Sequence, residues 1–263
     1  MNLIAEKLSL LCDPLTHDPV RLSYERVHGE EFLTTPSGRR FAIRRGVPTF
    51  LEDADTIGQN QKYQKFYDRF AGFYDLAIGL FAFLKSGGLE KRRREYLDEL
   101  EIKEGMRVLE VSVGTGMNLR FLPRTALYFG LDISWGMLKR CQRNLRRWGI
   151  DAFLVQGAAE HLPFVDGAFD AVLHMGGINF FNDKARALRE MVRVAKPGTK
   201  FVIVDETEQI TRRYDKTPLA SVFYGDQHEL ALAPVDSLPP GMLEVQVKKI
   251  ANGDLYCLTF RSP

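Results

Sequence analysis

Cysteine is scarce in this chain of 263 residues. The three thiols, Cys12, Cys141 and Cys257, are far apart in the sequence and odd in number. Such a set cannot supply the framework of paired bridges that stabilises small secreted domains, and it is typical of proteins in a reducing compartment. We therefore expect no disulfide, three thiols that fill the core, and a cytoplasmic location.

Long apolar runs are also missing. The most apolar stretch, residues 71–84, contains Asp75 and is shorter than the roughly 20 residues that a membrane-spanning helix needs. The N-terminus lacks the basic flank and clean apolar core of a secretion signal. We expect no transmembrane segment. The basic run at residues 91–94 is expected to be a solvated helix face, and its contact with a phosphate or an anionic membrane surface is the alternative.

Charge of one sign is not in excess. The chain has 36 Lys and Arg residues against 34 Asp and Glu residues, a formal net charge of +2. This balance gives no general footprint of a nucleic-acid-binding protein. The basic residues between 139 and 147 have the spacing of a solvent-facing helical stripe. We therefore expect a small-molecule substrate rather than nucleic acid, and the oligomeric state is left open.

The most informative segment is an apolar run that ends in Glu110 and leads into a turn of small residues. Gly114 and Gly116 allow a tight turn and leave room for a ligand, because neither carries a Cβ. The N–H groups that open the next helix, from Asn118, can face an anionic group. A second apolar run ends in Asp132, whose carboxylate is placed to accept hydrogen bonds from ribose hydroxyls. The segment therefore predicts a cofactor-binding strand, turn and helix.

Two departures separate this pattern from the dinucleotide-binding fingerprint. Leu119 occupies the place of the third glycine, and Glu110 lies close to where a pyrophosphate would bind. A carboxylate there repels phosphate but suits an ammonium group, such as that of the methionine part of S-adenosylmethionine (SAM). The residues therefore favour SAM over a nicotinamide dinucleotide.

Five ordered motifs carry a family resemblance that extends over about residues 63–261. Together they resemble the class I SAM-dependent methyltransferases, and in particular the ubiquinone/menaquinone and phospholipid methyltransferases. The resemblance implies a methyltransferase that uses SAM as its cofactor. The motifs are residues 110–116, 130–138, 157–164, 169–174 and 187–205.

The order of apolar segments predicts the fold class. Strands that alternate with helices indicate a parallel sheet with crossover helices. Two further strands, residues 243–250 and 255–260, form a hairpin through the turn at 252–254. We therefore expect an α/β protein with a Rossmann-like, seven-stranded methyltransferase sheet, a C-terminal antiparallel hairpin and a small N-terminal β-rich module. The parallel strands are expected near residues 107–111, 126–131, 152–156, 169–174 and 200–205.

Residues 1–53 have short β-like runs broken by proline and glycine. The segments around Cys12 and at residues 41–51 resemble the small zinc-ribbon proteins that activate RNA and protein methyltransferases. In that family, cysteines would fall near residues 13–16 and near Thr34, where this chain has none. Cys12 and His17 alone do not provide the four ligands of tetrahedral zinc. We expect a metal-free module that serves as a packing lid or helps to shape the substrate pocket.

Residues 54–100 are expected to form a polar linker up to Gln64 and then a helical cap, ahead of a methyltransferase domain at 101–263. The cap begins with the arrangement Tyr-Asp-x-x-Ala-x-x-Tyr-Asp at residues 67–75. This arrangement resembles the N-terminal cap of the quinone and phospholipid methyltransferases. The resemblance places Tyr67 and Tyr74 against SAM. The alternative is that both are ordinary residues of an amphipathic helix.

The family resemblance also implies the other cofactor contacts. Glu110 and the glycine turn would hold the amino-acid end of SAM, Asp132 the ribose, and Ile133 and Met137 the adenine. Related enzymes often have an acid at position 158 that accepts from the adenine amino group; here Ala158 stands there, so backbone groups must recognise adenine. The cofactor-binding residues that we expect are Tyr67, Tyr74, Glu110, Ser112, Gly114, Gly116, Asn118, Asp132, Ile133, Met137, Gly157, Ala158, Ala159 and His174.

Methyl transfer from a sulfonium is an in-line displacement, so the protein mainly positions and desolvates the nucleophile. A base is needed only for a protonated acceptor. Four residues are candidates that the sequence does not rank: His174, Asn179, Tyr224 and His228. A hydrogen-bonded structural histidine is the alternative for His174.

The segment after the fourth strand bears on the acceptor. Residues 175–181 contain no Asn-Pro-Pro-Tyr or Asp-Pro-Pro-Tyr sequence, which weighs against methylation of exocyclic base nitrogens. The Gly-Gly-Ile-Asn-Phe-Phe sequence suits a small, largely apolar or amphipathic acceptor such as a quinone, a lipid or a secondary metabolite. Two alternatives are kept: an rRNA or tRNA base methyltransferase, and a SAM-binding protein that transfers no methyl group.

Overall fold

The computed structural model describes residues 3–18, 23–27, 30–65, 68, 89–208 and 232–263. Among the described residues, α1 (Leu3–Ser9), α3 (Leu89–Leu97), α4 (Trp135–Trp148) and α5 (Lys184–Arg193) are α-helices, and residues 58–65 are helical as well. A small sheet contains β1 (Ser23–Val27), β2 (Glu30–Thr34), β3 (Arg40–Arg44) and β4 (Val47–Pro48). The large sheet contains β5 (Arg107–Val111), β6 (Leu127–Asp132), β7 (Ala152–Gln156), β8 (Phe169–Met175), β9 (Ala195–Glu206), β10 (Leu243–Ile250) and β11 (Leu255–Arg261).

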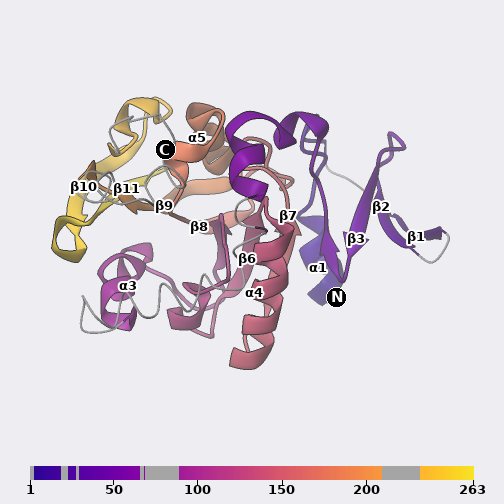
Figure 1. Ribbon diagram of the computed structural model, residues 1–263, viewed down its shortest axis with the longest axis horizontal. Coiled ribbons are helices and arrows are strands. Elements are labelled where there is room, and N and C mark those ends of the chain that lie inside the picture. Colours follow the sequence, from indigo (N-terminus) through magenta and orange to yellow (C-terminus); the bar gives the residue numbers. More distant parts are fainter. Residues whose placement is uncertain (1–2, 19–22, 28–29, 66–67, 69–88, 209–231) are drawn as a thin grey trace.

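The large sheet confirms the predicted fold class. Its seven strands lie in the order β10-β11-β9-β8-β5-β6-β7 (Figure 1). Strands β5 to β9 run parallel, whereas β11 is antiparallel to both β9 and β10. In the register, Val111 at the end of β5 lies beside Leu131 of β6 and His174 of β8. The carboxyl ends of these three strands therefore meet at one edge, where ligands bind in open α/β sheets.

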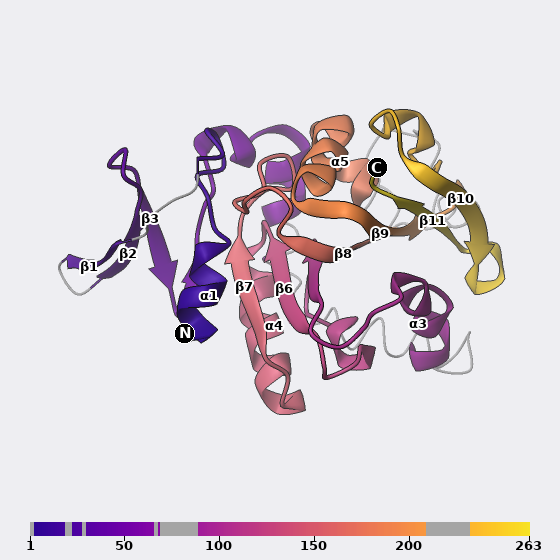
Figure 2. The ribbon, with the colours of Figure 1, turned by 180° about the vertical axis from the view of Figure 1, so that it is seen from behind.

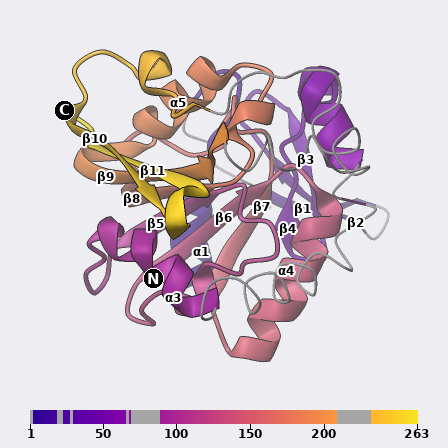
Figure 3. The same cartoon turned by 60° about the vertical axis from the view of Figure 1, so that its left-hand side comes forward.

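Helices cover both faces of the large sheet (Figure 3). On one face, Leu188 and Met191 of α5 share a core cluster with Phe201 of β9. On the other face, Leu97 of α3 and Leu138 of α4 belong to a second cluster. Because successive side chains of a strand point to opposite faces, each central strand contributes to both clusters. The result is the three-layer arrangement of a doubly wound α/β protein.

The N-terminal residues pack against the β7 edge of the large sheet, with α1 beside β7 (Figure 2). The Cys12 N–H donates to the Pro163 carbonyl at 3.1 Å, and the Phe50 N–H donates to the Gln156 carbonyl at 2.8 Å. Phe41 and Phe50 belong to the same core cluster as the α5 face of the large sheet. The boundary at residue 53 stays a prediction, and this segment shares a core with the rest of the protein.

An ion network occupies the place where a zinc ribbon would have its first ligands. Burial raises the pKa of the Cys12 thiol to about 12, so Cys12 stays protonated. The Asp13 carboxylate accepts from the Leu15 N–H at 2.9 Å and contacts Arg39. The His17 ring lies 3.6 Å from Glu190 of α5. Within the described residues, no three His, Cys, Asp or Glu side chains are grouped to hold a metal.

Two local expectations were wrong. Residues 58–65 are helical rather than a linker, because Asn182, distant in sequence, accepts from the Gln59 N–H at 2.9 Å and so caps the helix. After the glycine turn only a short 3₁₀ segment forms, Leu119–Phe121. It ends before Pro123, whose ring forces Leu122 into an extended conformation. Within the described residues, no helix is long and apolar enough to cross a membrane.

The N-terminal module is expected to bind no zinc, because its buried thiol is protonated and four nitrogen or sulfur ligands are missing. Elemental analysis of the untagged protein should show substoichiometric zinc, and Cys12→Ser should leave the zinc content unchanged. Stoichiometric zinc that disappears in Cys12→Ser would contradict this expectation.

Candidate cofactor site

The turn after β5 is shaped by backbone conformations that favour glycine. Ser112, Gly114 and Gly116 have φ angles of 60°, 54° and 76°. A Cβ at Gly116 would lie 2.7 Å from the Cys141 Sγ of α4, so only glycine allows this close approach. A Cβ at Gly114 would meet no atom within 4 Å. The space beside Gly114 is therefore open to a ligand.

Asp132 ties this turn to the end of β6. Its Oδ2 accepts from the Gly114 N–H at 2.8 Å, and its Oδ1 accepts from the Ser134 N–H at 2.9 Å. Burial raises the pKa of Asp132 to about 6, and the backbone N–H groups of Ser134, Gly114 and Ile133 oppose that rise. The side chain is therefore ionised at pH 7. Because a carboxylate has about four lone-pair sites, these donors leave Asp132 able to accept from a ribose hydroxyl.

The N-terminus of α4 next to Asp132 is doubly capped. The Ser134 Oγ accepts from the Met137 N–H at 3.1 Å and donates to Asp68 at 2.6 Å. Asp68 also accepts from the Gly136 N–H at 2.6 Å. A Cβ at Gly136 would lie 2.7 Å from the Asp68 Cα. Asp68, from the segment expected to form the cap, therefore lies directly over the start of α4.

Glu110, near the end of β5, has a nearly fully buried carboxyl group, and one of its two oxygens has a hydrogen-bond partner among the described residues. Its Oε1 accepts from the Asn118 Nδ2 at 2.5 Å, whereas its Oε2 has no hydrogen-bond partner among the described residues. Burial raises the pKa of Glu110 to about 8 and outweighs the Asn118 hydrogen bond and the attraction of Arg93. A ligand ammonium at Oε2 would stabilise the ionised form.

The basic run at residues 91–94 is not entirely a solvated face. Arg93 of α3 is only 6% exposed, and its Nη1 donates to the Tyr96 hydroxyl at 2.9 Å and contacts the Asn118 Oδ1. The sequence did carry a signal for this: Arg93, Tyr96, Leu97 and Leu100 have the spacing of one helix face, and all four are buried. Arg93 therefore contacts the residues of the candidate site, and it was not among the residues expected there.

The expected adenine side is built from the ends of β6 and β7. Two side-chain amides donate to the Ile133 carbonyl: Gln156 Nε2 at 3.0 Å and Gln64 Nε2 at 3.2 Å. The Gly157 N–H donates to the Asp132 carbonyl at 3.2 Å. Ala158 is 2% exposed and Met137 is 3% exposed. The residues expected to contact adenine therefore lie at one end of the sheet, and their contact with the cofactor stays a prediction.

Asp205, at the end of β9, fixes the loop that follows β8. Its Oδ2 accepts from the N–H groups of Gly177 and Ile178 at 3.2 and 3.1 Å. The Asn179 amide lies 3.5 Å from the same oxygen and accepts from Lys184 at 2.9 Å. Burial raises the pKa of Asp205, and these N–H donors oppose that rise. Sequence reasoning gave this carboxylate no role, because its partners lie on another loop.

His174 is fully buried. Its Nδ1 lies 3.0 Å from the Val111 carbonyl, which can only accept, so Nδ1 carries the proton. Its Nε2 has no hydrogen-bond partner among the described residues. Burial lowers the pKa of His174 to about 4, so the ring is neutral at pH 7. The geometry favours the structural alternative for this histidine.

Four of the expected residues lie outside the described part of the chain: Tyr67, Tyr74, Tyr224 and His228.

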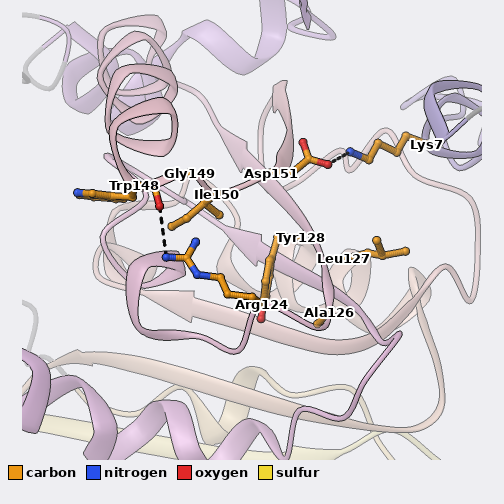
Figure 4. A pocket seen from close by; sticks show the side chains of 9 residues that line it. All are labelled: Lys7, Arg124, Ala126, Leu127, Tyr128, Trp148, Gly149, Ile150 and Asp151. Atoms are coloured by element: carbon orange, nitrogen blue, oxygen red, sulfur yellow. Dashed lines mark hydrogen bonds and ion pairs between the residues drawn. The ribbon is translucent and has the colours of Figure 1, made fainter.

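A surface pocket of about 440 Å³ lies at the opposite, amino end of β6 and β7 (Figure 4). There Arg124 donates to the Trp148 carbonyl at 3.5 Å, at the C-terminus of α4. A cation at this helix end interacts favourably with the helix dipole, and this interaction accounts for the position of Arg124 without a bound ligand.

Comparison with known proteins identifies the family. The methyltransferase domain family matches residues 109–203. Demethylmenaquinone methyltransferase of Thermotoga maritima is 33% identical over 162 residues, which cover 60% of this chain and 67% of the relative. The chain belongs to the class I SAM-dependent methyltransferases. SAM is therefore its cofactor, as the residues around Glu110 predict.

Other relatives match over shorter lengths. Demethylmenaquinone methyltransferase of Renibacterium salmoninarum is 38% identical over 140 residues, 53% of this chain and 56% of the relative. Phthiotriol/phenolphthiotriol dimycocerosates methyltransferase 1 of Mycobacterium ulcerans is 42% identical over 104 residues, 38% of each chain. The match thus spans little more than half of the first relative and less of the second.

Solved structures with low sequence identity share the fold. A SAM-dependent methyltransferase of Thermotoga maritima superposes with a TM-score of 0.57 at 19% identity, over 78% of this chain and all of the other. The [4+2]-cyclase SpnF superposes with a TM-score of 0.54 at 20% identity, over 67% of this chain and 82% of the other. Both support the arrangement of the sheet and say nothing of the acceptor.

The residues of the site fit SAM. The Glu110 Oε2, which has no partner within the part of the chain that the structure describes, suits the ammonium. The open side of Gly114 leaves room for the ligand, and Asp132 can still accept from the ribose. When bound, SAM supplies a methyl group activated by a sulfonium.

Asp132→Ala should weaken S-adenosylhomocysteine binding about 10- to 100-fold, because charge-assisted hydrogen bonds to the ribose are lost. The thermal shift that the ligand gives the wild type should shrink accordingly. Isothermal titration calorimetry measures the affinity. Asp151→Ala, which removes an exposed acid at the other end of the sheet, is the matched control and should bind as the wild type does. Unchanged affinity in Asp132→Ala would refute this assignment.

Ligand binding at pH 7 should release protons from Glu110. The raised pKa of about 8 leaves the free carboxyl mostly protonated at pH 7, and a bound ammonium favours the ionised form. Affinity should therefore rise from pH 6 towards pH 8. Calorimetry in two buffers of different ionisation enthalpy measures the protons released. Glu110→Gln should release none at this site, and a buffer-independent heat for the wild type would contradict the expectation.

Proposed function

We propose that this chain transfers a methyl group from SAM to a small, largely apolar or amphipathic acceptor: a quinone, a lipid or a secondary metabolite. The observation that carries the proposal is the juxtaposition of a SAM-type site with an aromatic, glycine-lined loop at the same edge of the sheet. That loop follows β8, the strand directly beside β5.

The aromatic contact on this loop supports an apolar acceptor. The Phe180 ring stacks on Tyr63 of the helical residues 58–65, with 4.0 Å between centroids. Gly176 is partly exposed and a Cβ on it would meet no atom within 4 Å. Ile178 is fully buried, so only part of residues 176–181 can face an acceptor. Aromatic rings and a side-chain-free backbone suit a flat, apolar molecule.

Methyl transfer from SAM requires mainly that the protein positions the acceptor and removes water from it. Asp205 holds the backbone of this loop in place through N–H groups, and the Asn179 amide contacts the same carboxylate. His174 is a poor general base, because its pKa is lowered to about 4 and its Nδ1 is engaged with the Val111 carbonyl. The base for a protonated acceptor therefore has to come from another group.

The names of the relatives agree with this acceptor class. Two relatives are named for demethylmenaquinone and one for phthiotriol dimycocerosates. Because the match covers only part of each relative, the acceptor of this chain is a proposal. The alternative of a SAM-binding protein that transfers no methyl group is decided by the experiment that follows.

Incubation with SAM labelled on its methyl group should place the label in a quinone and lipid extract, and total RNA should take up none. Added salt should matter little, because burial of apolar surface rather than phosphate contact drives acceptor binding. Asp132→Ala is the control that should strongly reduce labelling at a limiting SAM concentration. Label in RNA alone would establish the RNA-modifying alternative, and cofactor binding without label in either fraction would establish the non-transferring one.

A further inference from the structure

Arg93 is a buried cation with unused hydrogen-bonding capacity beside the cofactor site. Its Nη1 is engaged with Tyr96 and Asn118, whereas its Nε–H has no partner among the described residues. The next residue, Arg94, behaves as an ordinary surface arginine: its side chain is 48% exposed and pairs with Glu90 and Asp98 along α3. Burial of Arg93 therefore needs an explanation that Arg94 does not.

Asn118 connects the Arg93 guanidinium to the side-chain carboxyl group of Glu110. Its Oδ1 accepts from Arg93 and, at 2.6 Å, from the Tyr96 hydroxyl, and its Nδ2 donates to Glu110 at 2.5 Å. The cation and the carboxylate thus bind opposite ends of one amide, and no direct hydrogen bond between them is present. Each also has one buried polar atom, the Arg93 Nε or the Glu110 Oε2, that has no hydrogen-bond partner among the residues that the structure describes.

One of these two atoms is a hydrogen-bond donor on a cation and the other is an acceptor on a carboxyl group. Together they indicate a ligand that carries both a negative and a positive group. A buried polar atom without a partner is destabilising, and more so when its group is charged. The amino-acid end of SAM carries an ammonium and a carboxylate on the same carbon. An ammonium satisfies the Glu110 Oε2, and a carboxylate satisfies a guanidinium N–H.

We propose that Arg93 binds the carboxylate of the cofactor's amino-acid end while Glu110 binds its ammonium. This inference rests on the proposed cofactor site and assigns it a specificity: the pocket selects ligands with an intact amino acid. A ligand without the carboxylate leaves Arg93 uncompensated and binds weakly.

Calorimetry with two ligands separates this role from a structural one. S-adenosylhomocysteine has the complete amino acid, and its decarboxylated analogue lacks only the carboxylate. The wild type should bind S-adenosylhomocysteine at least about tenfold more tightly than the analogue. Arg93→Met should lose most of this preference, because its affinity for S-adenosylhomocysteine falls while that for the analogue stays within about threefold of the wild type. Arg93→Lys should keep an intermediate preference, and Arg94→Met is the matched control with both affinities unchanged.

The outcomes are distinguishable. If Arg93 only positions Asn118, Arg93→Met weakens both ligands by the same factor, and the inference is overturned. Equal affinity of the wild type for the two ligands overturns it as well, without any need for a folded variant. If the wild type binds neither ligand, the cofactor site itself fails. A preference in the wild type that Arg93→Met removes supports the inference.

Discussion

The cofactor site depends on a carboxylate that the fold buries before any ligand is present. Glu110 lies at the end of a central strand, with neighbours on both sides, so water cannot solvate its charge. One hydrogen bond from Asn118 does not compensate for the burial, and the pKa rises to about 8. The ionised form of Glu110 is unfavourable in the free protein and becomes favourable beside an ammonium group. The burial that the fold imposes on Glu110 therefore favours ligands that carry an ammonium.

The surrounding structure holds this carboxylate in position. Asp132 accepts from the Gly114 N–H and fixes the turn after β5, and Asn118 lies between Glu110 and Arg93. The left-handed φ of Ser112 adds a strained position to the same turn. The helix α3 contributes Arg93 and the turn contributes Asn118 to one buried hydrogen-bond network around Glu110.

The loop after β8, which we propose faces the acceptor, is organised by a different carboxylate and by aromatic contact. Asp205 fixes the loop after β8 through backbone N–H groups, and this leaves the Phe180 ring free to stack on Tyr63. Glu160 joins the same regions, since its Oε1 accepts from Asn60 at 3.2 Å and from the Asn182 N–H at 2.9 Å. Through Glu160, the helical residues 58–65 are thus connected to the segment that follows the loop after β8.

The sequence by itself determined the sheet, the hairpin and the residues at the strand ends, because these follow from apolar period, glycine placement and the position of acids after strands. Only the tertiary structure decided the rest. It buried Arg93 within a run of basic residues, it capped residues 58–65 with the distant Asn182, and it turned His174 into a neutral, hydrogen-bonded core residue. Each of these depends on a partner far away in the chain, and a local pattern carries no information about a partner that only folding brings into contact.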